Sequence, residues 1–227
     1  VGVAGEWQVT DATDGVDDNP GDGYCGTTSD ADESDCTLRA AIMEANASGE
    51  DSTITFDSTV TTVTLTDNTT DEDEANHGDL DILVNITITG DATNKTTIDG
   101  SSIDDRIFHV GGNSDSSSTT PNYVTLTIQN LILTGGGSSS LDSGGAVFAY
   151  YSGFVADNCE FKLNQSNDSG GAVNVQLSSS ASISDSTFTY NSSESAGAIY
   201  IGFSSILTLS GSTVSYTHLT LPTSPKV

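Results

Sequence analysis

Basic residues are scarce in this chain. Only five of its 227 residues are Lys or Arg, against 32 Asp and Glu, which gives a formal net charge of −27. Proteins bind nucleic-acid phosphates with clustered Lys and Arg, so this composition excludes nucleic acid as a partner. No run of 18 apolar residues occurs, and the sequence therefore predicts no transmembrane helix.

Cysteine is also rare, with three residues. Cys25 and Cys36 bracket an acidic loop that has no core-forming side chains. A disulfide between them would cross-link that loop and would indicate an oxidising compartment. A zinc site is the alternative, but no His or further Cys lies nearby in the sequence. Cys159 aligns with Ser186 and Ser212, and this column of small residues predicts a packing role for Cys159.

The carboxylates are unevenly distributed, since 25 of the 32 fall within residues 1–105. Such a surface fits high salt, where charge repulsion is screened, or an exterior rich in divalent cations. Both readings place the protein outside the cell. No secretory signal is visible and the chain begins without Met, which indicates a mature or excised piece.

Two acidic clusters are candidates for calcium, because hard cations prefer oxygen ligands. The first lies in a Gly-rich loop and has Asp14, Asp17, Asp18 and Asp22 as its candidate ligands, and the second comprises residues 71–74 and Asp79. Neither cluster has the ligand spacing of an EF-hand loop. Solvated acidic loops are therefore the alternative, and no cofactor is required.

A phrase returns at a fixed interval in the second half of the chain. Gly144, Gly170 and Ala196 each begin a Gly-Gly-Ala-Val-like segment and lie 26 residues apart. A Phe-x-x-Asn phrase follows at Phe161 and again at Phe188. Repeats of this length are typical of stacked architectures, in which no unit can bury its apolar face alone.

Within each repeat, apolar and polar residues alternate with the period of a β-strand. The alternation places Val147, Val173 and Ile199 in one interior column. Short strands without helical crossovers predict an all-β fold, a parallel β-helix. Polar corners are expected at residues 164–169 and 191–195, and strands are expected at 52–56, 63–65, 82–90, 97–100, 107–110 and 124–133.

Residues 37–46 differ from the rest because Leu38, Ile42 and Ala45 fall on one helical face. A short helix before a solenoid is expected to cap its first coil. We expect Arg39 of this helix to hold carboxylates or carbonyl groups. The expected organisation is a cap region over residues 1–50, coils over 51–214 and a tail over 215–227.

Aromatic side chains recur on the outward face of the repeats. Phe148, Tyr150 and Tyr200, together with Tyr151, could form a platform for sugar rings or a partner protein. An aromatic ladder that merely stabilises the sheet is the alternative.

The cap region and repeats together resemble known secreted proteins. The segment from Cys25 through Cys36-Thr-Leu-Arg-Ala-Ala-Ile-Met-Glu-Ala-Asn46 resembles the "CSLREA" region of secreted bacterial and archaeal proteins. The Gly-Gly-Ala-Val and Phe-x-x-Asn phrases resemble the repeats of chlamydial polymorphic outer-membrane proteins. The resemblance implies a right-handed parallel β-helix of the pectin-lyase-like superfamily that is exported and exposed at the cell surface.

Residues 215–227 break the alternation and hold two of the four prolines. They resemble the conceptual translation of a sequencing-adapter read-through at the end of a metagenomic gene fragment. On that reading the natural protein continues with more coils and an anchor, whereas the alternative is a genuine tail or linker.

The sequence offers little for catalysis on such a fold. His77, His109 and His218 are scattered without triad or metal spacing, and Asp-Asp pairs occur only at 17–18 and 104–105, with no second carboxylate motif. An ion pair is expected for Arg106. The predicted function is an adhesion or scaffold module at the cell surface, whose partners are surface glycans or proteins of a host or neighbouring cell. A polysaccharide lyase or hydrolase is the alternative.

Overall fold

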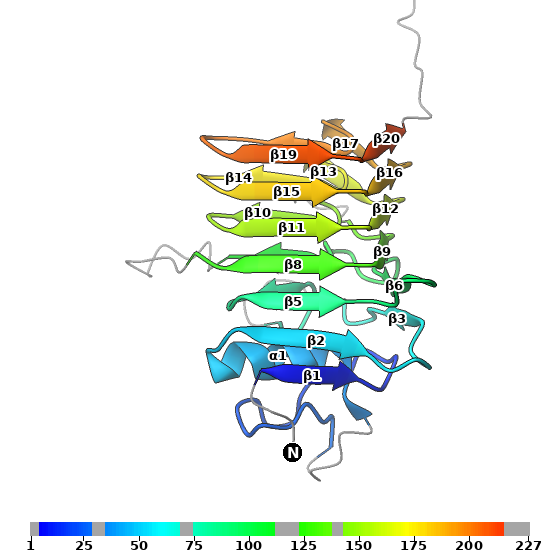
Figure 1. Cartoon of the computed structure of the whole chain (residues 1–227), viewed down its shortest axis with the longest axis vertical. Helices are drawn as coiled ribbons and strands as arrows, with labels where there is room; N and C mark the ends of the chain where they lie inside the picture. Colours follow the sequence, from blue (N-terminus) through cyan, green and yellow to red (C-terminus); the bar gives the residue numbers. More distant parts are fainter. Residues whose placement is uncertain (1–4, 29–34, 69–74, 112–122, 138–142, 216–227) are drawn as a thin grey trace, which may run out of the picture.

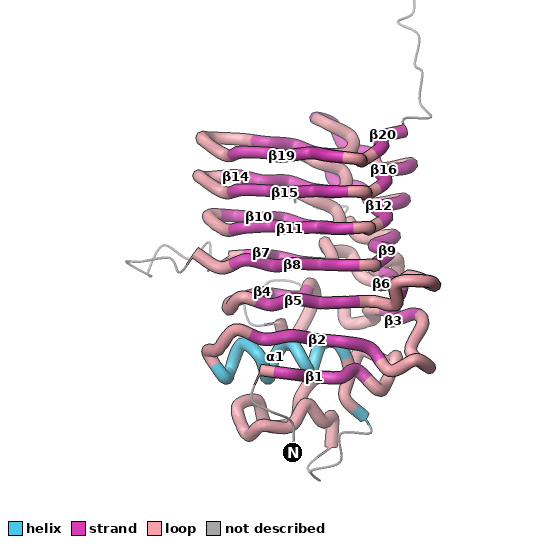
Figure 2. Tube along the Cα trace, viewed as in Figure 1, coloured by secondary structure: helices cyan, strands magenta, loops and turns pink. Residues whose placement is uncertain are grey.

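The protein is a stack of parallel β-strand coils, seen from the side in Figure 1 and Figure 2. A computed structural model describes residues 5–28, 35–68, 75–111, 123–137 and 143–215. All strands in its four sheets pair in parallel, so successive coils lie about 4.8 Å apart. This arrangement confirms the predicted all-β parallel β-helix.

The sheets run along the stack, and each coil contributes one strand to most of them. The seven-stranded sheet contains β1 (Glu6–Val9), β2 (Ser52–Phe56), β5 (Ile86–Thr89), β8 (Thr125–Gln129), β11 (Gly153–Asp157), β15 (Ser180–Ser184) and β19 (Ile206–Ser210). The five-stranded sheet contains β4 (Leu80–Ile82), β7 (Phe108–Val110), β10 (Val147–Tyr150), β14 (Val173–Gln176) and β18 (Ile199–Ile201). The six-stranded sheet contains β3 (Thr62–Thr64), β6 (Thr96–Asp99), β9 (Leu131–Thr134), β12 (Glu160–Lys162), β16 (Thr187–Thr189) and β20 (Thr213–Ser215). The two-stranded sheet contains β13 (Gln165–Ser169) and β17 (Ser192–Ser195).

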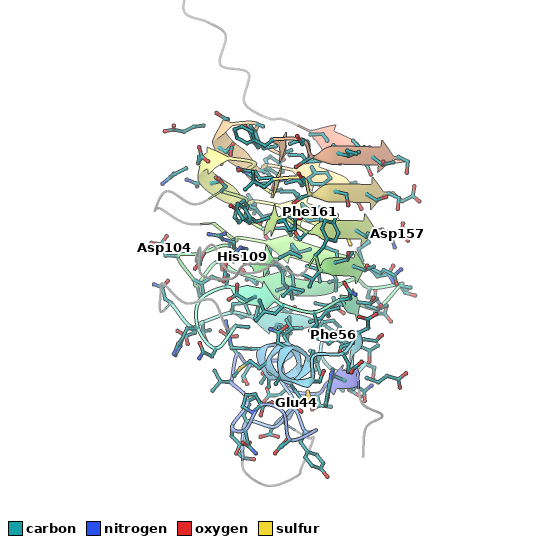
Figure 3. All side chains as sticks on the ribbon, turned by 90° about the vertical axis from the view of Figure 1, so that its left-hand side faces the viewer. Glu44, Phe56, Asp104, His109, Asp157 and Phe161 are labelled. Carbon is teal, nitrogen blue, oxygen red and sulfur yellow. A yellow bond between two sulfur atoms is a disulfide. The ribbon has the colours of Figure 1, made fainter. Side chains whose placement is uncertain are left out.

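The interior consists of columns of like side chains. Val147 pairs in register with Val173, and Val173 pairs with Ile199, which confirms the predicted column. Phe161 and Phe188 stack with ring centroids 4.6 Å apart and an interplanar angle of 3°. Figure 3 shows Phe161 among the interior side chains, whereas Asp157 points away from the stack. The aliphatic and aromatic columns therefore form one continuous core along the solenoid axis.

A sharp corner precedes β10, β14 and β18, the last three strands of the five-stranded sheet. Gly144 and Gly170 have φ angles of 74° and 68°, in the left-handed region that glycine adopts without steric cost. Ala196 occupies the same position in the next coil and has a φ of 60°. The recurring glycine thus satisfies a backbone requirement of the corner, and Ala196 meets it under strain.

The amino-terminal cap is built around α1 (Leu38–Ser48), the one α-helix among the described residues. The side chain of Thr37 accepts a hydrogen bond from the backbone N–H of Ala40 and so begins the helix, and Gly49 ends it in a left-handed conformation. The helix contacts β1 and β4 at the first coils. Within the described part of the chain, no helix is long and apolar enough to cross a membrane.

Several local predictions are wrong. Residues 82–90 are not one strand, because β4 ends at Ile82 and β5 covers Ile86–Thr89. Residues 165–169 and 192–195 are not corners, because they pair as β13 and β17. Residues 124–133 form two strands, since Asn130 turns the chain with a φ of 56°. Strand β1, which the sequence analysis did not predict, pairs with β2 at the edge of the seven-stranded sheet. Residues 216–227, nearly all of the expected tail, lie outside the described residues.

Candidate ligand-binding site

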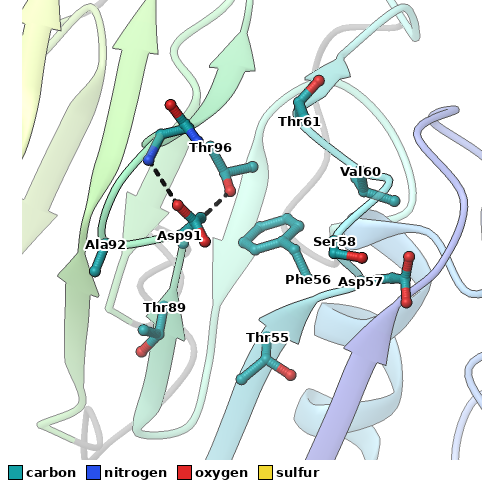
Figure 4. A pocket seen from close by; sticks show the side chains of 12 residues that line it. Thr55, Phe56, Asp57, Ser58, Val60, Thr61, Thr89, Asp91, Ala92 and Thr96 are labelled. Atoms are coloured by element: carbon teal, nitrogen blue, oxygen red, sulfur yellow. Dashed lines mark hydrogen bonds between the residues drawn. The ribbon is translucent and has the colours of Figure 1, made fainter.

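A pocket of 540 Å³ opens between the turns of two neighbouring coils (Figure 4). One turn follows β2 and begins at Asp57, and the other follows β5 and begins at Asp91. Phe56 supplies the only aromatic ring of the lining. The lining also has six side chains with a hydroxyl or amide group: Thr55, Ser58, Thr61, Thr89, Asn94 and Thr96.

Both turns are held by the aspartate at which they begin. The Oδ1 atom of Asp57 accepts hydrogen bonds from the backbone N–H and the hydroxyl of Thr59, at 2.9 and 2.7 Å. The Oδ1 atom of Asp91 accepts from the backbone N–H groups of Thr93 and Asn94, at 2.8 and 2.6 Å. Side chains that bond to the backbone two residues ahead define turns of this kind.

The same hydrogen bonds set the charge of the pocket. The Thr59 hydroxyl, followed by its N–H, lowers the pKa of Asp57, and the N–H groups of Asn94 and Thr93 lower the pKa of Asp91. Both carboxyl groups are therefore ionised at neutral pH. The pocket carries two negative charges beside a ring and several neutral hydrogen-bonding groups.

Phe56 is placed by its position at the end of β2. It pairs with Val9 in register and is partly buried against the hydrophobic core. In Figure 4 its ring lies between the two turns, with Asp91 on one side and Ser58 on the other. Strand pairing therefore fixes the backbone of Phe56, core packing covers part of its side chain, and the rest lines the pocket.

The outward side of the seven-stranded sheet forms a largely polar surface that adjoins this pocket through Thr55 and Thr89. Register brings Thr53 beside Thr87 and Thr87 beside Thr127, while Thr55 lies beside Thr89. Further along the stack, Ser182 pairs with Thr208 and Ser184 with Ser210. We call this surface the hydroxyl face, and its remaining outward positions include Gln129, Val155 and Asp157.

A charged network lies on the outward side of the five-stranded sheet. His109 Nδ1 lies 3.1 Å from Asp81 Oδ1, and these two residues pair in register on β7 and β4. Arg106 Nε lies 3.2 Å from Asp79 Oδ2 and 3.6 Å from Asp105 Oδ1. The ion pair of Arg106 was predicted from the sequence, but the meeting of these five residues was not.

Burial gives this network its electrostatic character. Asp79, Asp81 and His109 are 6%, 1% and 8% exposed. Burial, followed by the charge of Asp81, raises the pKa of Asp79 well above its usual range, and the charge of Arg106 opposes this rise. Because the groups are covered and paired with one another, the network is suited to holding the preceding loops against the sheet.

The predicted aromatic platform is only partly contiguous. Phe148 packs on Tyr150 with a centroid distance of 5.7 Å, but the ring of His109 also stacks on Phe148, at 5.4 Å. The guanidinium of Arg106 lies 5.0 Å from the Phe148 centroid. Buried Asn174 on β14 pairs with Phe148 on β10 and with Tyr200 on β18, so it separates the two aromatic residues. The structure therefore brings Phe148 and Tyr150 together and leaves Tyr200 apart from them.

The amino-terminal acidic loop contains the predicted disulfide. Cys25 and Cys36 are bonded, and Cys159 is free and buried, both as the sequence predicted. Asp14 lies in a buried ion pair with Arg39, whose Nε is 2.8 Å from Asp14 Oδ1. Arg39 also donates to carbonyl oxygens of the segment that precedes β4, including those of Ala75 and Gly78. The expectation that Arg39 holds carboxylates and carbonyl groups is confirmed.

The calcium candidates do not form one cluster. Asp14 forms an ion pair with Arg39, and Asp22 accepts a hydrogen bond from the Asn19 side-chain amide at 3.1 Å. Over the described ranges, no group of three or more His, Cys, Asp or Glu side chains is arranged to hold a metal ion. Residues 71–74 of the second acidic cluster lie outside those ranges, and its Asp79 belongs to the charged network. Calcium binding through Asp17, Asp18 and Asp22 stays a prediction.

Glu44 of helix α1 holds this loop, a role that was not predicted from the sequence. It is 1% exposed and accepts hydrogen bonds from the backbone N–H groups of Gly21 and Gly23. Burial raises the pKa of nearby Asp17 to about 7, the N–H of Asn19 opposes that shift, and Glu44, Asp22 and Asp18 add to it. Helix α1 thus shapes the acidic loop through one buried carboxylate.

The pocket was also missed in the sequence analysis. The sequence pattern that marks its two turns is an aspartate followed two residues later by threonine, at Asp57 and again at Asp91. Asp57 directly follows β2 and Asp91 lies two residues after the end of β5, but only the register of β2 with β5 places the two turns side by side. No family model, no curated protein and no solved structure matches this chain.

Proposed function

We propose that this chain is an extracellular adhesion or scaffold module that binds its partner along the side of the solenoid. The hydroxyl face is the observation that carries this proposal. Its Thr and Ser side chains recur at the strand spacing of about 4.8 Å and present donors and acceptors in rows. A rigid surface with a repeating pattern suits a partner that repeats, such as a glycan chain, or a strand-like segment of a protein.

Two further features support a location outside the cell. The Cys25–Cys36 disulfide is compatible with an oxidising compartment. The net charge of −27 suits a salt-rich exterior, where counterions screen repulsion. The resemblance to secreted and surface-exposed repeat proteins agrees with both features.

Adhesion of coated beads to cells tests the proposal. Beads that carry the purified chain should attach to cells of a natural community, and attachment should fall when Thr127→Glu and Ser182→Glu are combined. The matched control is Thr187→Glu, an exposed threonine on β16 of another sheet. Loss of attachment with the control as well, or no attachment by the original chain, would contradict binding through the hydroxyl face.

A polysaccharide-active enzyme is the second candidate. The observation that favours it is the meeting of Asp79, Asp81, Arg106 and His109, since a carboxyl group whose pKa is raised by burial can serve as a general acid. The test is an assay for lyase or hydrolase products on acidic polysaccharides, with and without Ca²⁺. Activity that disappears in Asp81→Asn would favour the enzyme over the adhesion module.

A further inference from the structure

We infer that the pocket between the turns after β2 and β5 binds an uncharged sugar ring. This inference rests on the proposed function, because it names the class of ligand and the place where an adhesion module of this kind would hold it. The volume of 540 Å³ lies within the range of small-molecule sites. Three properties of the lining favour such a ligand.

The first property is the aromatic ring. A pyranose has one side that presents mainly C–H groups, and such a side packs on an aromatic face as other apolar groups do. Phe56 is partly buried and ends a paired strand, so its ring is already ordered before a ligand arrives. Little conformational entropy is then lost on binding, which favours affinity.

The second property is the balance of hydrogen-bonding groups around that ring. Sugar hydroxyls both donate and accept, and so do the side chains of Thr55, Thr61 and Thr89. The Asp57 and Asp91 carboxylates accept only, and charge makes such hydrogen bonds stronger than neutral ones. Their positions are fixed by their own turns, so the acceptors are held ready for a ligand hydroxyl.

The third property is the sign of the charge. Two ionised carboxylates beside the cavity oppose phosphate, sulfate or uronate groups. Lysine and arginine are absent from the lining. The pocket therefore selects against the acidic sugars that a polysaccharide lyase would need and favours a neutral pyranose.

The test measures binding of methyl glycosides of glucose, galactose and mannose, and of their linear tetrasaccharides, to the full chain by NMR and calorimetry. At least one neutral glycoside should bind, and glucuronate should bind at least about tenfold more weakly because of charge repulsion. Phe56→Leu keeps the apolar packing but removes the ring, and it should weaken binding about tenfold. Asp91→Asn keeps a turn-forming oxygen and should also weaken binding about tenfold.

The control is Asp99→Asn. Asp99 makes the same kind of turn, with Oδ1 accepting from the Ser101 N–H at 2.9 Å, but it does not line the pocket. This variant should bind as the original chain does. Asp91 is exposed, so Asp91→Asn is expected to fold even if Phe56→Leu does not.

Three results would overturn the inference: no neutral glycoside binds, glucuronate binds equally well, or binding survives both pocket variants unchanged. The bead assay separates this failure from that of the proposed function. Attachment without sugar binding leaves the adhesion module standing and removes the pocket. Sugar binding without attachment of the beads would support the pocket and contradict the adhesion module.

Discussion

The amide Nδ2 of Asn164 donates a hydrogen bond to Oδ1 of Asn191, one coil further along the stack, at 3.0 Å. The same Oδ1 accepts from the backbone N–H of Asn164, and Asn164 also donates to the Leu133 carbonyl. Its Oδ1 accepts from the N–H of Gly136. Both asparagines are buried, so their side chains satisfy buried backbone groups at and beyond the ends of the strands.

We expect Asn164→Ala to lower the free energy of unfolding by about 3 kcal/mol. The substitution leaves a buried N–H and a buried carbonyl without partners, and each costs about 1–3 kcal/mol. Chemical denaturation monitored by circular dichroism measures the change. The exposed neighbour Gln165 provides the control, since Gln165→Ala should change stability by less than about 0.5 kcal/mol.

The coil corners predict opposite effects for two substitutions. Ala196→Gly should stabilise the protein by about 0.5 kcal/mol, because relief of a left-handed alanine exceeds the entropy cost of glycine. Gly170→Ala should destabilise it by at least about 2 kcal/mol, because its Cβ would lie 2.3 Å from the Val173 carbonyl oxygen. Thermal melts of both variants test the pair, and equal shifts would contradict a special corner geometry.

Stability should fall between about pH 4 and pH 7 as Asp17 ionises. The pKa of Asp17 is about 7 in the folded chain and about 3.8 in the unfolded chain, so the folded state binds the proton more tightly. The stabilisation is complete below pH 3.8 and is lost as the pH rises through 7. Asp17→Asn removes this dependence, and at pH 8 it should be more stable by about 2 kcal/mol, allowing for solvent screening at the loop.

The measurement is the difference in unfolding free energy between Asp17→Asn and the original chain from pH 4 to pH 8. Exposed Asp18 on the same loop supplies the control, since Asp18→Asn should give a nearly constant difference. A difference for Asp17→Asn that does not change with pH would show that the carboxyl group is already ionised at low pH.

Salt should stabilise the cap and first coils. The 25 carboxylates in residues 1–105 repel one another, and the Debye length shortens from about 30 Å at 0.01 M to about 3 Å at 1 M salt. We expect the melting temperature to rise by several degrees over that range of NaCl. No rise would mean that the internal ion pairs already compensate the repulsion.

A comparison of CaCl₂ with NaCl distinguishes specific binding of Ca²⁺ from general screening of charge. If Asp17, Asp18 and Asp22 hold Ca²⁺, millimolar CaCl₂ should raise the melting temperature beyond NaCl of equal ionic strength. Combined substitution of these three residues by alanine should abolish the additional rise. An equal response to both salts would remove calcium from the description of this loop.

The period of the repeat was sufficient to predict the fold, because stacked coils must place like residues above like. Val147, Val173 and Ile199 illustrate this, since their spacing alone determines that they share a column. The pocket could not be predicted in the same way. The first coils have unequal lengths, so nothing in the sequence aligns Asp57 with Asp91 until β2 and β5 are known to pair. The Asp81–His109 pair was missed for the same reason.

The uneven distribution of carboxylates along the chain also affects the electric field of the whole molecule. Most carboxylates belong to the cap and first coils, whereas residues 192–215 of the last coil contain a single charged side chain, Glu194. The coils follow one another in chain order along the stack, as Figure 1 shows, so the charge gradient lies along its long axis. The molecule therefore has a large permanent dipole moment. Near a negatively charged surface, the resulting torque would turn the cap away and bring the nearly uncharged coils closest to that surface.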